Sequence, residues 1–195
     1  MKRQYRSYQI PDAKVGFYGT GINKVSVAQA GKLEKLIEPV QEYFTNLLEI
    51  KPVRLSLRYL GYHDEINIDN LRDARAKILP IYKKYLPITV KVVGLSENWK
   101  KHPRIQRQFL LADVKNEKVT ALHKELLKLT TVFPIFQAVE GNNFQPHITL
   151  AELKPKYHKN IPSEVEKYIK SQKLDIDITF KGAYVWGKRG PRQLI

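Results

Sequence analysis

The chain contains no cysteine, which excludes thiol nucleophiles, cysteine metal ligands and disulfide bonds. It has no run near the ~18 to 20 apolar residues of a membrane span, and no apolar core of signal-peptide length follows its amino terminus. Acidic residues are few, because 19 Asp and Glu stand against 34 Lys and Arg and leave a net charge of +15. We therefore expect a cytoplasmic protein with no membrane contact and with phosphate-bearing partners such as nucleic acid or nucleotides.

The length and apolar content predict a folded protein. A chain of 195 residues with 43% hydrophobic residues can bury one good core, either as one body or as two small lobes that share an interface. No low-complexity linker divides it. We expect residues 1–195 to form a single domain and the protein to be a monomer.

Apolar residues recur at helical spacing in three segments and suggest a fourth, shorter helix. Pro39 is expected to kink or divide the first, and Pro80 lies within the second. Ser163 and Glu166 form a capping box at the start of the last. The predicted helices span residues 26–49, 69–86, 117–129 and 163–172.

Strands are predicted between these helices. In the strand at residues 53–60, alternation places Arg54, Ser56 and Arg58 together on one polar face. Gly19-Thr20-Gly21 is predicted to be a turn, because the remaining residues of a phosphate-binding loop are missing. The predicted strands span residues 14–18, 53–60, 88–95, 106–114, 147–153, 176–180 and 183–186.

The strand at residues 147–153 carries a candidate chemical site. Residues two apart face the same way, so His147 and Thr149 project together. The imidazole can transfer a proton near neutral pH, and the hydroxyl can donate to a phosphoryl oxygen. Taken alone, the pair has a structural alternative, a half-buried histidine hydrogen-bonded to the backbone.

Two segments together resemble the motifs of a known family. Residues 144–151, FQPHITLA, are similar to the second motif of the 2H phosphoesterases, the superfamily of 2′-5′ RNA ligase-like proteins and 2′,3′-cyclic phosphodiesterases. Residues 53–61, VRLSLRYLG, resemble the first motif, where a family member shows His-x-Thr or His-x-Ser. The order of helices and strands around the motifs also fits, so the resemblance covers essentially the whole chain.

The resemblance implies an α+β fold of two similar α/β lobes, whose antiparallel sheets flank a central groove lined by both motifs. In such enzymes one histidine is the general base and the other the general acid, hydroxyls hold the phosphate, and no metal or other cofactor is required. Carried over, His147 and Thr149 are the catalytic pair of the second motif. Arg54 and Ser56 are the substrate-binding residues of the first.

Arg54 departs from the family pattern. A guanidinium has a pKa above ~12 and cannot act as a base at neutral pH, although it can grip phosphate oxygens. Two functions therefore stay open. The protein is either an impaired or modified phosphodiesterase acting on 2′,3′-cyclic or 2′-5′ linkages of RNA ends or small nucleotides, or a non-catalytic nucleotide- or RNA-binding protein. An engineered substitution at position 54 is a further explanation.

Other residues admit competing interpretations. His63 follows the first motif and is either a replacement proton carrier or a solvated loop residue. His123 is expected at the surface of its helix, and the five histidines show no metal-ligand spacing. Tyr184 and Trp186 precede a basic tail and either stack a base or pack in the core. An unrelated basic α/β RNA-binding domain with a structural His147 is the third functional hypothesis.

Overall fold

The computed structural model describes residues 17–49, 52–62, 68–98, 107–131, 144–187 and 190–195. The α-helices are α1 (Val27–Glu34), α2 (Ile68–Tyr85), α3 (Glu117–Leu127) and α4 (Ser163–Ser171), with 3-10 turns η1 (Glu38–Val40), η2 (Lys128–Thr131) and η4 (Pro155–Tyr157). The strands are β1 (Phe17–Asn23), β2 (Phe44–Asn46), β3 (Leu55–Tyr62), β4 (Ile88–Glu97), β5 (Phe109–Lys115), β6 (His147–Leu153), β7 (Lys173–Phe180), β8 (Gly182–Gly187) and β9 (Gly190–Gln193).

All nine strands belong to one antiparallel sheet. Its order is β7-β4-β5-β6-β3-β1-β8-β9, and β2 pairs with β6 beside this path. Strands β3 and β6 share a single register pair, Leu55 with Ile148. The sheet therefore consists of two well-paired halves joined at its centre by the two strands that carry the motifs.

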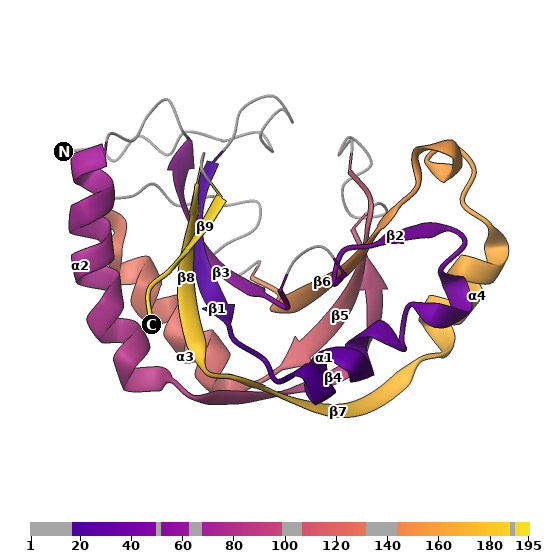
Figure 1. The fold of residues 1–195 in the computed structure, drawn as a ribbon, viewed down its shortest axis with the longest axis horizontal. Coiled ribbons are helices and arrows are strands. Elements are labelled where there is room, and N and C mark those ends of the chain that lie inside the picture. The colour runs from indigo at the N-terminus through magenta and orange to yellow at the C-terminus, as the bar shows by residue number, and fades with distance from the viewer. Residues whose placement is uncertain (1–16, 50–51, 63–67, 99–106, 132–143, 188–189) are drawn as a thin grey trace.

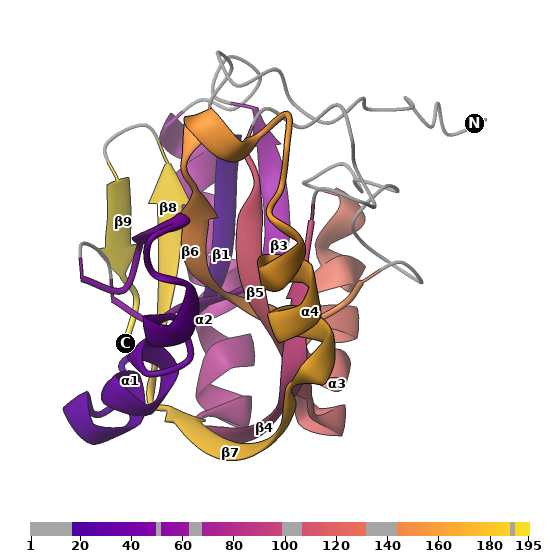
Figure 2. The same cartoon turned by 90° about the vertical axis from the view of Figure 1, so that its right-hand side faces the viewer.

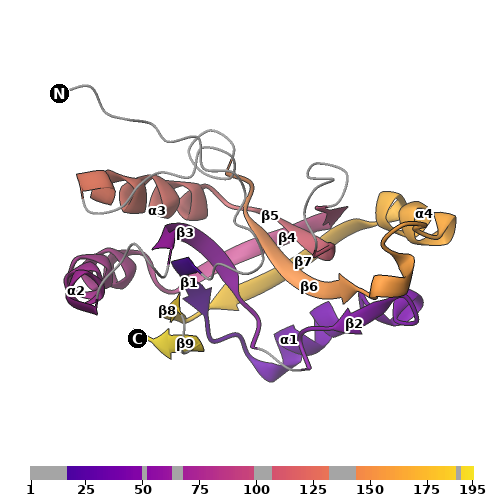
Figure 3. The same ribbon diagram turned by 90° about the horizontal axis from the view of Figure 1, so that it is seen from above.

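Each half of the sheet has its own pair of helices. Helices α2 and α3 contact each other, and α3 packs on β3, whereas α1 packs on β7 and α4 on β4. Figure 1 shows the sheet bent into a wide V with the helices outside it. Figure 2 views α1 and α4 in front of the strands, and Figure 3 shows the two helix pairs at opposite ends of the molecule. The halves are not successive in the chain, because β8 and β9 return to pair beside β1.

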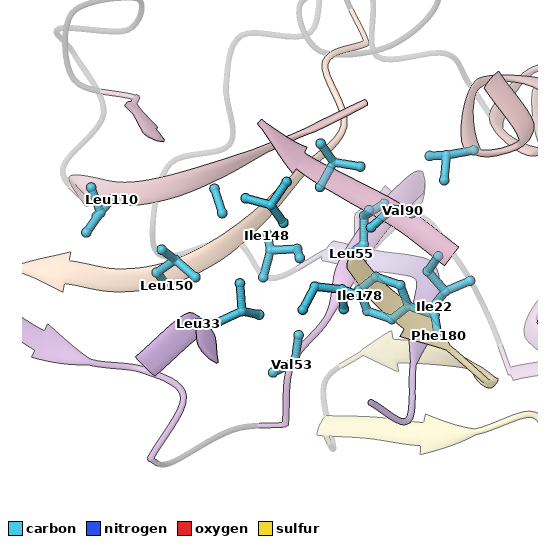
Figure 4. Packing of buried hydrophobic residues seen from close by; sticks show 14 of the residues in the cluster. Ile22, Leu33, Val53, Leu55, Val90, Leu110, Ile148, Leu150, Ile178 and Phe180 are labelled. Carbon is cyan, nitrogen blue, oxygen red and sulfur yellow. The ribbon is translucent and has the colours of Figure 1, made fainter. Parts of the chain in front are cut away.

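The core lies on the face of the sheet that meets the helices. A row of residues in register crosses five strands on this face, and each member is fully buried: Ala112, Ile148, Leu55, Ile22 and Ala183. Figure 4 shows Leu33 of α1 against the same cluster as Ile148 and Leu150. Burial of one such Leu or Ile side chain stabilises the fold by about 1.5 to 3 kcal/mol. This packing fixes the side of the sheet to which each neighbouring polar residue turns.

Most predicted elements are present, and the α+β class with an antiparallel sheet is confirmed. The predicted strand at residues 147–153 coincides with β6, and the helix over residues 69–86 is α2, with Pro80 inside it. The predicted helix over residues 26–49 is wrong in its second half. It ends at Glu34, and Phe44–Asn46 forms β2, because Phe44 is buried opposite Leu153 of β6.

Two local predictions are also wrong. Gly19-Thr20-Gly21 is not a turn but the middle of β1, paired on both sides. The capping box at Ser163 does not form the helix start, because the N-cap of α4 is Pro162 and makes no side-chain cap hydrogen bond. The last strand, β9, was not anticipated, while the basic loop at residues 100–104 and the turn at residues 141–143 lie outside the described residues. In the described part of the chain, no helix is both long and apolar enough to cross a membrane.

Candidate functional site

The polar residues of both motif strands turn away from the core. Leu55 and Ile148 are fully buried, and their neighbours Ser56, His147 and Thr149 are half-buried. Because side chains alternate along a strand, these neighbours lie on the opposite face of the sheet, inside the V. We call this the motif face and define it by Arg54, Ser56, His147 and Thr149.

The pairing of Leu55 with Ile148 arranges these four residues as a grid. In an antiparallel pair, the residue after Leu55 lies beside the residue before Ile148, so Ser56 neighbours His147 and Arg54 neighbours Thr149. Arg54 and His147 then occupy one diagonal, which in such pairs spans roughly 7 to 8 Å between backbones. One phosphate group fits between side chains at that separation. The structure thus brings together all four residues that the sequence predicted for the site.

His147 is held in a defined tautomer. Its Nδ1 lies 2.9 Å from the backbone oxygen of Gln145. A carbonyl oxygen only accepts, so Nδ1 carries the proton and donates it in this hydrogen bond. The neutral imidazole therefore keeps its lone pair on Nε2, the atom that can take up a proton during a reaction.

Arg54 is held by an aromatic ring. Its guanidinium carbon lies 5.3 Å from the centroid of the Tyr184 ring, a distance at which a cation is attracted to the ring face. Tyr184 is only 2% exposed. Within the part of the chain that the structure describes, the buried Nε of Arg54 has no hydrogen-bond partner. Its position is thus set by stacking, and at least one N–H remains to donate to an anion.

Arg58 does not share the motif face, so the prediction of a cationic face with Arg54, Ser56 and Arg58 is wrong. The register of β1 with β3 shifts between Thr20 and Gly21, so Leu57 is an extra residue in β3. Beyond this bulge Arg58 stands opposite Thr20, on the core face, and is 2% exposed. A one-residue bulge reverses the alternation of every residue that follows it.

His123 is buried rather than at the surface. It is 1% exposed, its Nδ1 lies 2.6 Å from the backbone oxygen of Leu57, and its ring stacks on Phe144 at 3.7 Å between centroids. Burial lowers the pKa of His123, and the nearby Arg58 lowers it further, although the hydrogen bond to Leu57 opposes them. The neutral ring thus packs against the bulge of the first motif and the lead-in of the second.

The remaining predicted residues contribute nothing to the grid. His63, His102 and Tyr59's side chain lie outside the described residues, and His158 bonds the backbone oxygen of Leu153. Over the described ranges, no three His, Asp or Glu residues gather as metal ligands. A cavity of about 410 Å³ lies away from the grid, lined by Lys83, Leu86, Pro87, Lys181 and Ile195.

Two features of the motif face were missed from the sequence. Asp113 lies directly opposite His147 in the β5–β6 pair, and the Ser96 hydroxyl donates to its Oδ1 at 2.5 Å. Gly19 and Gly21 of β1 lie beneath the rings of Trp186 and Tyr184. A strand pairing across the sequence determines both features, and no local pattern signals either of them.

The sequence alone has no match in two comparisons, since no family model and no curated protein matches it. Solved structures do match. Usb1 of Kluyveromyces marxianus superposes with a TM-score of 0.57 at 14% identity, covering 92% of this chain and 97% of Usb1. LigT of Escherichia coli gives 0.58 at 10% identity, with 93% and 94% covered. TT0787 of Thermus thermophilus gives 0.53 at 17% identity, with 91% and 93% covered.

These similarities concern the fold. Usb1 and LigT are members of the 2H phosphoesterase superfamily, and a further match is described as a phosphoesterase. Similar structures include Usb1 with uridine monophosphate and LigT complexed with NADP+. The predicted 2H phosphoesterase-like fold is therefore confirmed over more than nine-tenths of the chain.

Proposed function

We propose that the protein is a 2H-type phosphodiesterase that acts, in a modified or impaired form, on 2′,3′-cyclic or 2′-5′-linked phosphodiesters of RNA ends or small nucleotides. The observation that carries this proposal is the register pair of Leu55 with Ile148. It sets the hydroxyls of Ser56 and Thr149 beside a guanidinium and an imidazole on one face of the sheet. The nucleotide complexes of Usb1 and LigT support a nucleotide ligand.

The four residues divide the work between binding and proton transfer. The hydroxyls of Ser56 and Thr149 donate to phosphate oxygens, and the Arg54 guanidinium stabilises the charge that develops on them. For a cyclic substrate, the oxygen of water forms a bond to phosphorus while the bond to the 2′ or 3′ oxygen breaks. His147 moves one proton in this exchange at Nε2, and the leaving oxygen takes up a proton to give a phosphomonoester.

Arg54 limits the rate. A two-histidine site has a base on one side of phosphorus and an acid on the other, and Arg54 supplies neither. Loss of one such group commonly lowers a rate by about 10²- to 10⁴-fold. The proposed enzyme is therefore slow on a substrate whose leaving oxygen needs a proton early.

A non-catalytic role on the same fold is the second candidate, and the replacement at Arg54 favours it. Such a protein binds the nucleotide or RNA end and releases it unchanged. With a net charge of +15 it also contacts phosphates beyond the grid, so its affinity for RNA falls steeply with salt. A single-phosphate nucleotide shows a weaker salt dependence.

One incubation separates the two candidates. The protein is mixed with a panel of 2′,3′-cyclic nucleotides and 2′-5′-linked dinucleotides, in EDTA because the family resemblance implies no metal, and the products are identified by mass spectrometry. The enzyme gives a mass gain of one water on a cyclic substrate. Saturable binding of the panel without any product selects the binding protein, and neither product nor binding contradicts both.

A further inference from the structure

Two glycines of β1 carry two aromatic rings from β8 on the motif face. Gly21 pairs with Tyr184 and Gly19 with Trp186. A Cβ atom on Gly19 would overlap Cζ2 and Cη2 of Trp186, and one on Gly21 would lie 3.0 Å from Cε1 of Tyr184. Only glycine allows a ring to lie this close to a strand backbone.

The contact at Gly19 defines how the indole lies. The atoms nearest to the missing Cβ, namely Cζ2, Cη2 and Cε2, all belong to its six-membered ring. A side chain placed above a strand position normally meets another side chain there, but this ring meets backbone. Trp186 therefore lies low over β1, and it is half-buried rather than enclosed.

The rings continue the grid of the motif face. Gly21 also pairs with Ser56, and the Tyr184 ring above Gly21 holds the Arg54 guanidinium. The Tyr184 and Trp186 rings lie 5.6 Å apart with a tilt of 33°. From Ser56 to the backbone beneath Trp186 is one strand spacing across and two residues along, roughly 8 Å.

The core interpretation of Trp186 fails on its direction. Ala183 of β8 belongs to the fully buried row on the helix side, and β8 residues of the other parity turn to the face without helices. Tyr184 on that face is covered, which leaves Trp186 as the ring with accessible surface beside Arg54. An aromatic ring next to cations is a surface on which a base stacks.

We propose that Trp186 is the platform for the nucleobase of the nucleotide whose phosphate lies at Arg54, Ser56, His147 and Thr149. The inference rests on the proposed function, because it takes the grid as the phosphate site. It adds that the ligand is recognised by its base as well as by its phosphate. Stacking uses the face of the ring, so any of the four bases is accepted.

Fluorescence tests the platform directly, because the chain has only two tryptophans. Replacing the other one, Trp99→Phe, leaves Trp186 as the single indole, and His147→Ala in the same protein prevents turnover. Adenosine 2′,3′-cyclic phosphate is expected to quench this emission saturably. Inorganic phosphate is expected to compete with the nucleotide without quenching by itself.

Affinities from calorimetry complete the test. Trp186→Ala is expected to weaken nucleotide binding about 5- to 150-fold and to leave inorganic phosphate binding unchanged. Trp186→Phe keeps a ring and retains most of the affinity. Gly19→Ala displaces the indole with Trp186 intact and gives the same selective loss. Tyr157→Ala, which removes a half-buried ring from η4 away from the grid, changes neither affinity.

The outcomes separate this inference from the function beneath it. If the nucleotide binds but neither quenches Trp186 nor loses affinity in Trp186→Ala, the platform is wrong and the phosphate site stands. If neither nucleotide nor phosphate binds, the proposed function fails and the platform with it. Equal losses for nucleotide and phosphate in a folded Trp186→Ala protein also overturn the platform.

Discussion

Asp113 lies directly opposite His147 across the β5–β6 strand pair, so a carboxylate and the proposed proton carrier share the motif face. The Ser96 hydroxyl, from the next strand, donates to the same carboxylate. Residues in such a pair have Cβ atoms about 4.5 to 5.5 Å apart. A negative charge at that distance stabilises an imidazolium, whereas Arg54 on the other side opposes it.

This pairing gives a prediction about Asp113. In Asp113→Asn the imidazolium loses its favourable neighbour, and opposite charges in a cross-strand pair are worth about 0.2 to 1 kcal/mol. Phosphodiester hydrolysis should therefore slow by up to about fivefold, with no change in nucleotide affinity. Steady-state kinetics check this, with the exposed Lys115→Gln on the same strand as control. A rate unchanged in Asp113→Asn removes Asp113 from the account.

His123 predicts how stability depends on pH. Burial lowers its pKa, so the folded protein keeps His123 neutral where an unfolded histidine, with a pKa near ~6.5, takes up a proton. The unfolded state then binds more protons, and the free energy of unfolding falls as the pH drops from above ~7 through 6.5 and below. Arg58, the charged group that acts on this ring, adds to the effect.

The variant His123→Gln should reduce this pH dependence. Urea unfolding at several pH values between about 5 and 8 measures it, and Lys124→Gln, an exposed neighbour on α3, is the control that keeps the wild-type profile. An identical profile for His123→Gln and the wild type would show that other groups dominate the acid sensitivity.

A buried hydrogen-bond chain behind the motif face predicts unequal stabilities. Thr20 donates to the backbone oxygen of Tyr184 at 2.7 Å, so the Tyr82 hydroxyl, 2.9 Å away, is the donor to Thr20. Tyr82→Phe removes only the end of this chain and should lower the free energy of unfolding by about 1 kcal/mol. Thr20→Val leaves the Tyr82 hydroxyl and the Tyr184 oxygen without Thr20 and should cost about 2 to 3 kcal/mol. Chemical denaturation measures both, and equal losses would contradict the chain.

The sequence was sufficient for features that depend on local periodicity. Alternation around Ile148 set the faces of β6 correctly, and the same alternation placed Ser56 and Arg54 opposite Leu55. It failed at Arg58, because the bulge at Leu57 exists only in the pairing of β3 with β1. His123 was misplaced because its burial comes from packing against Leu57 and Phe144, and neither contact is local in the chain.

Long-range pairing also explains the errors in the first 50 residues. Phe44 fits the helical spacing of its neighbours, yet its pairing with Leu153 makes it part of a strand. Gly19 and Gly21 look like turn residues, but their lack of side chains serves the two rings of β8. In both places a partner more than 100 residues away overrides the local preference.

Arg54 provides the sharpest test of the motif alignment. In Arg54→His the missing imidazole returns to the diagonal of the grid, and hydrolysis of a 2′,3′-cyclic nucleotide should rise by about 10²- to 10⁴-fold. Arg54→Lys keeps the positive charge without an imidazole and should show no rise. Initial rates decide the matter, and a folded Arg54→His protein that binds nucleotide but gains no activity refutes the alignment of the two motifs.

The most direct test of the central claim is the initial rate of 2′,3′-cyclic nucleotide hydrolysis by the wild-type protein and by His147→Ala, followed by mass spectrometry in the presence of EDTA. The account predicts slow conversion to the phosphomonoester by the wild type and a rate at least about 100-fold lower for His147→Ala. An equal rate in the two proteins would contradict it, because the reaction would then proceed without the only imidazole on the four-residue grid.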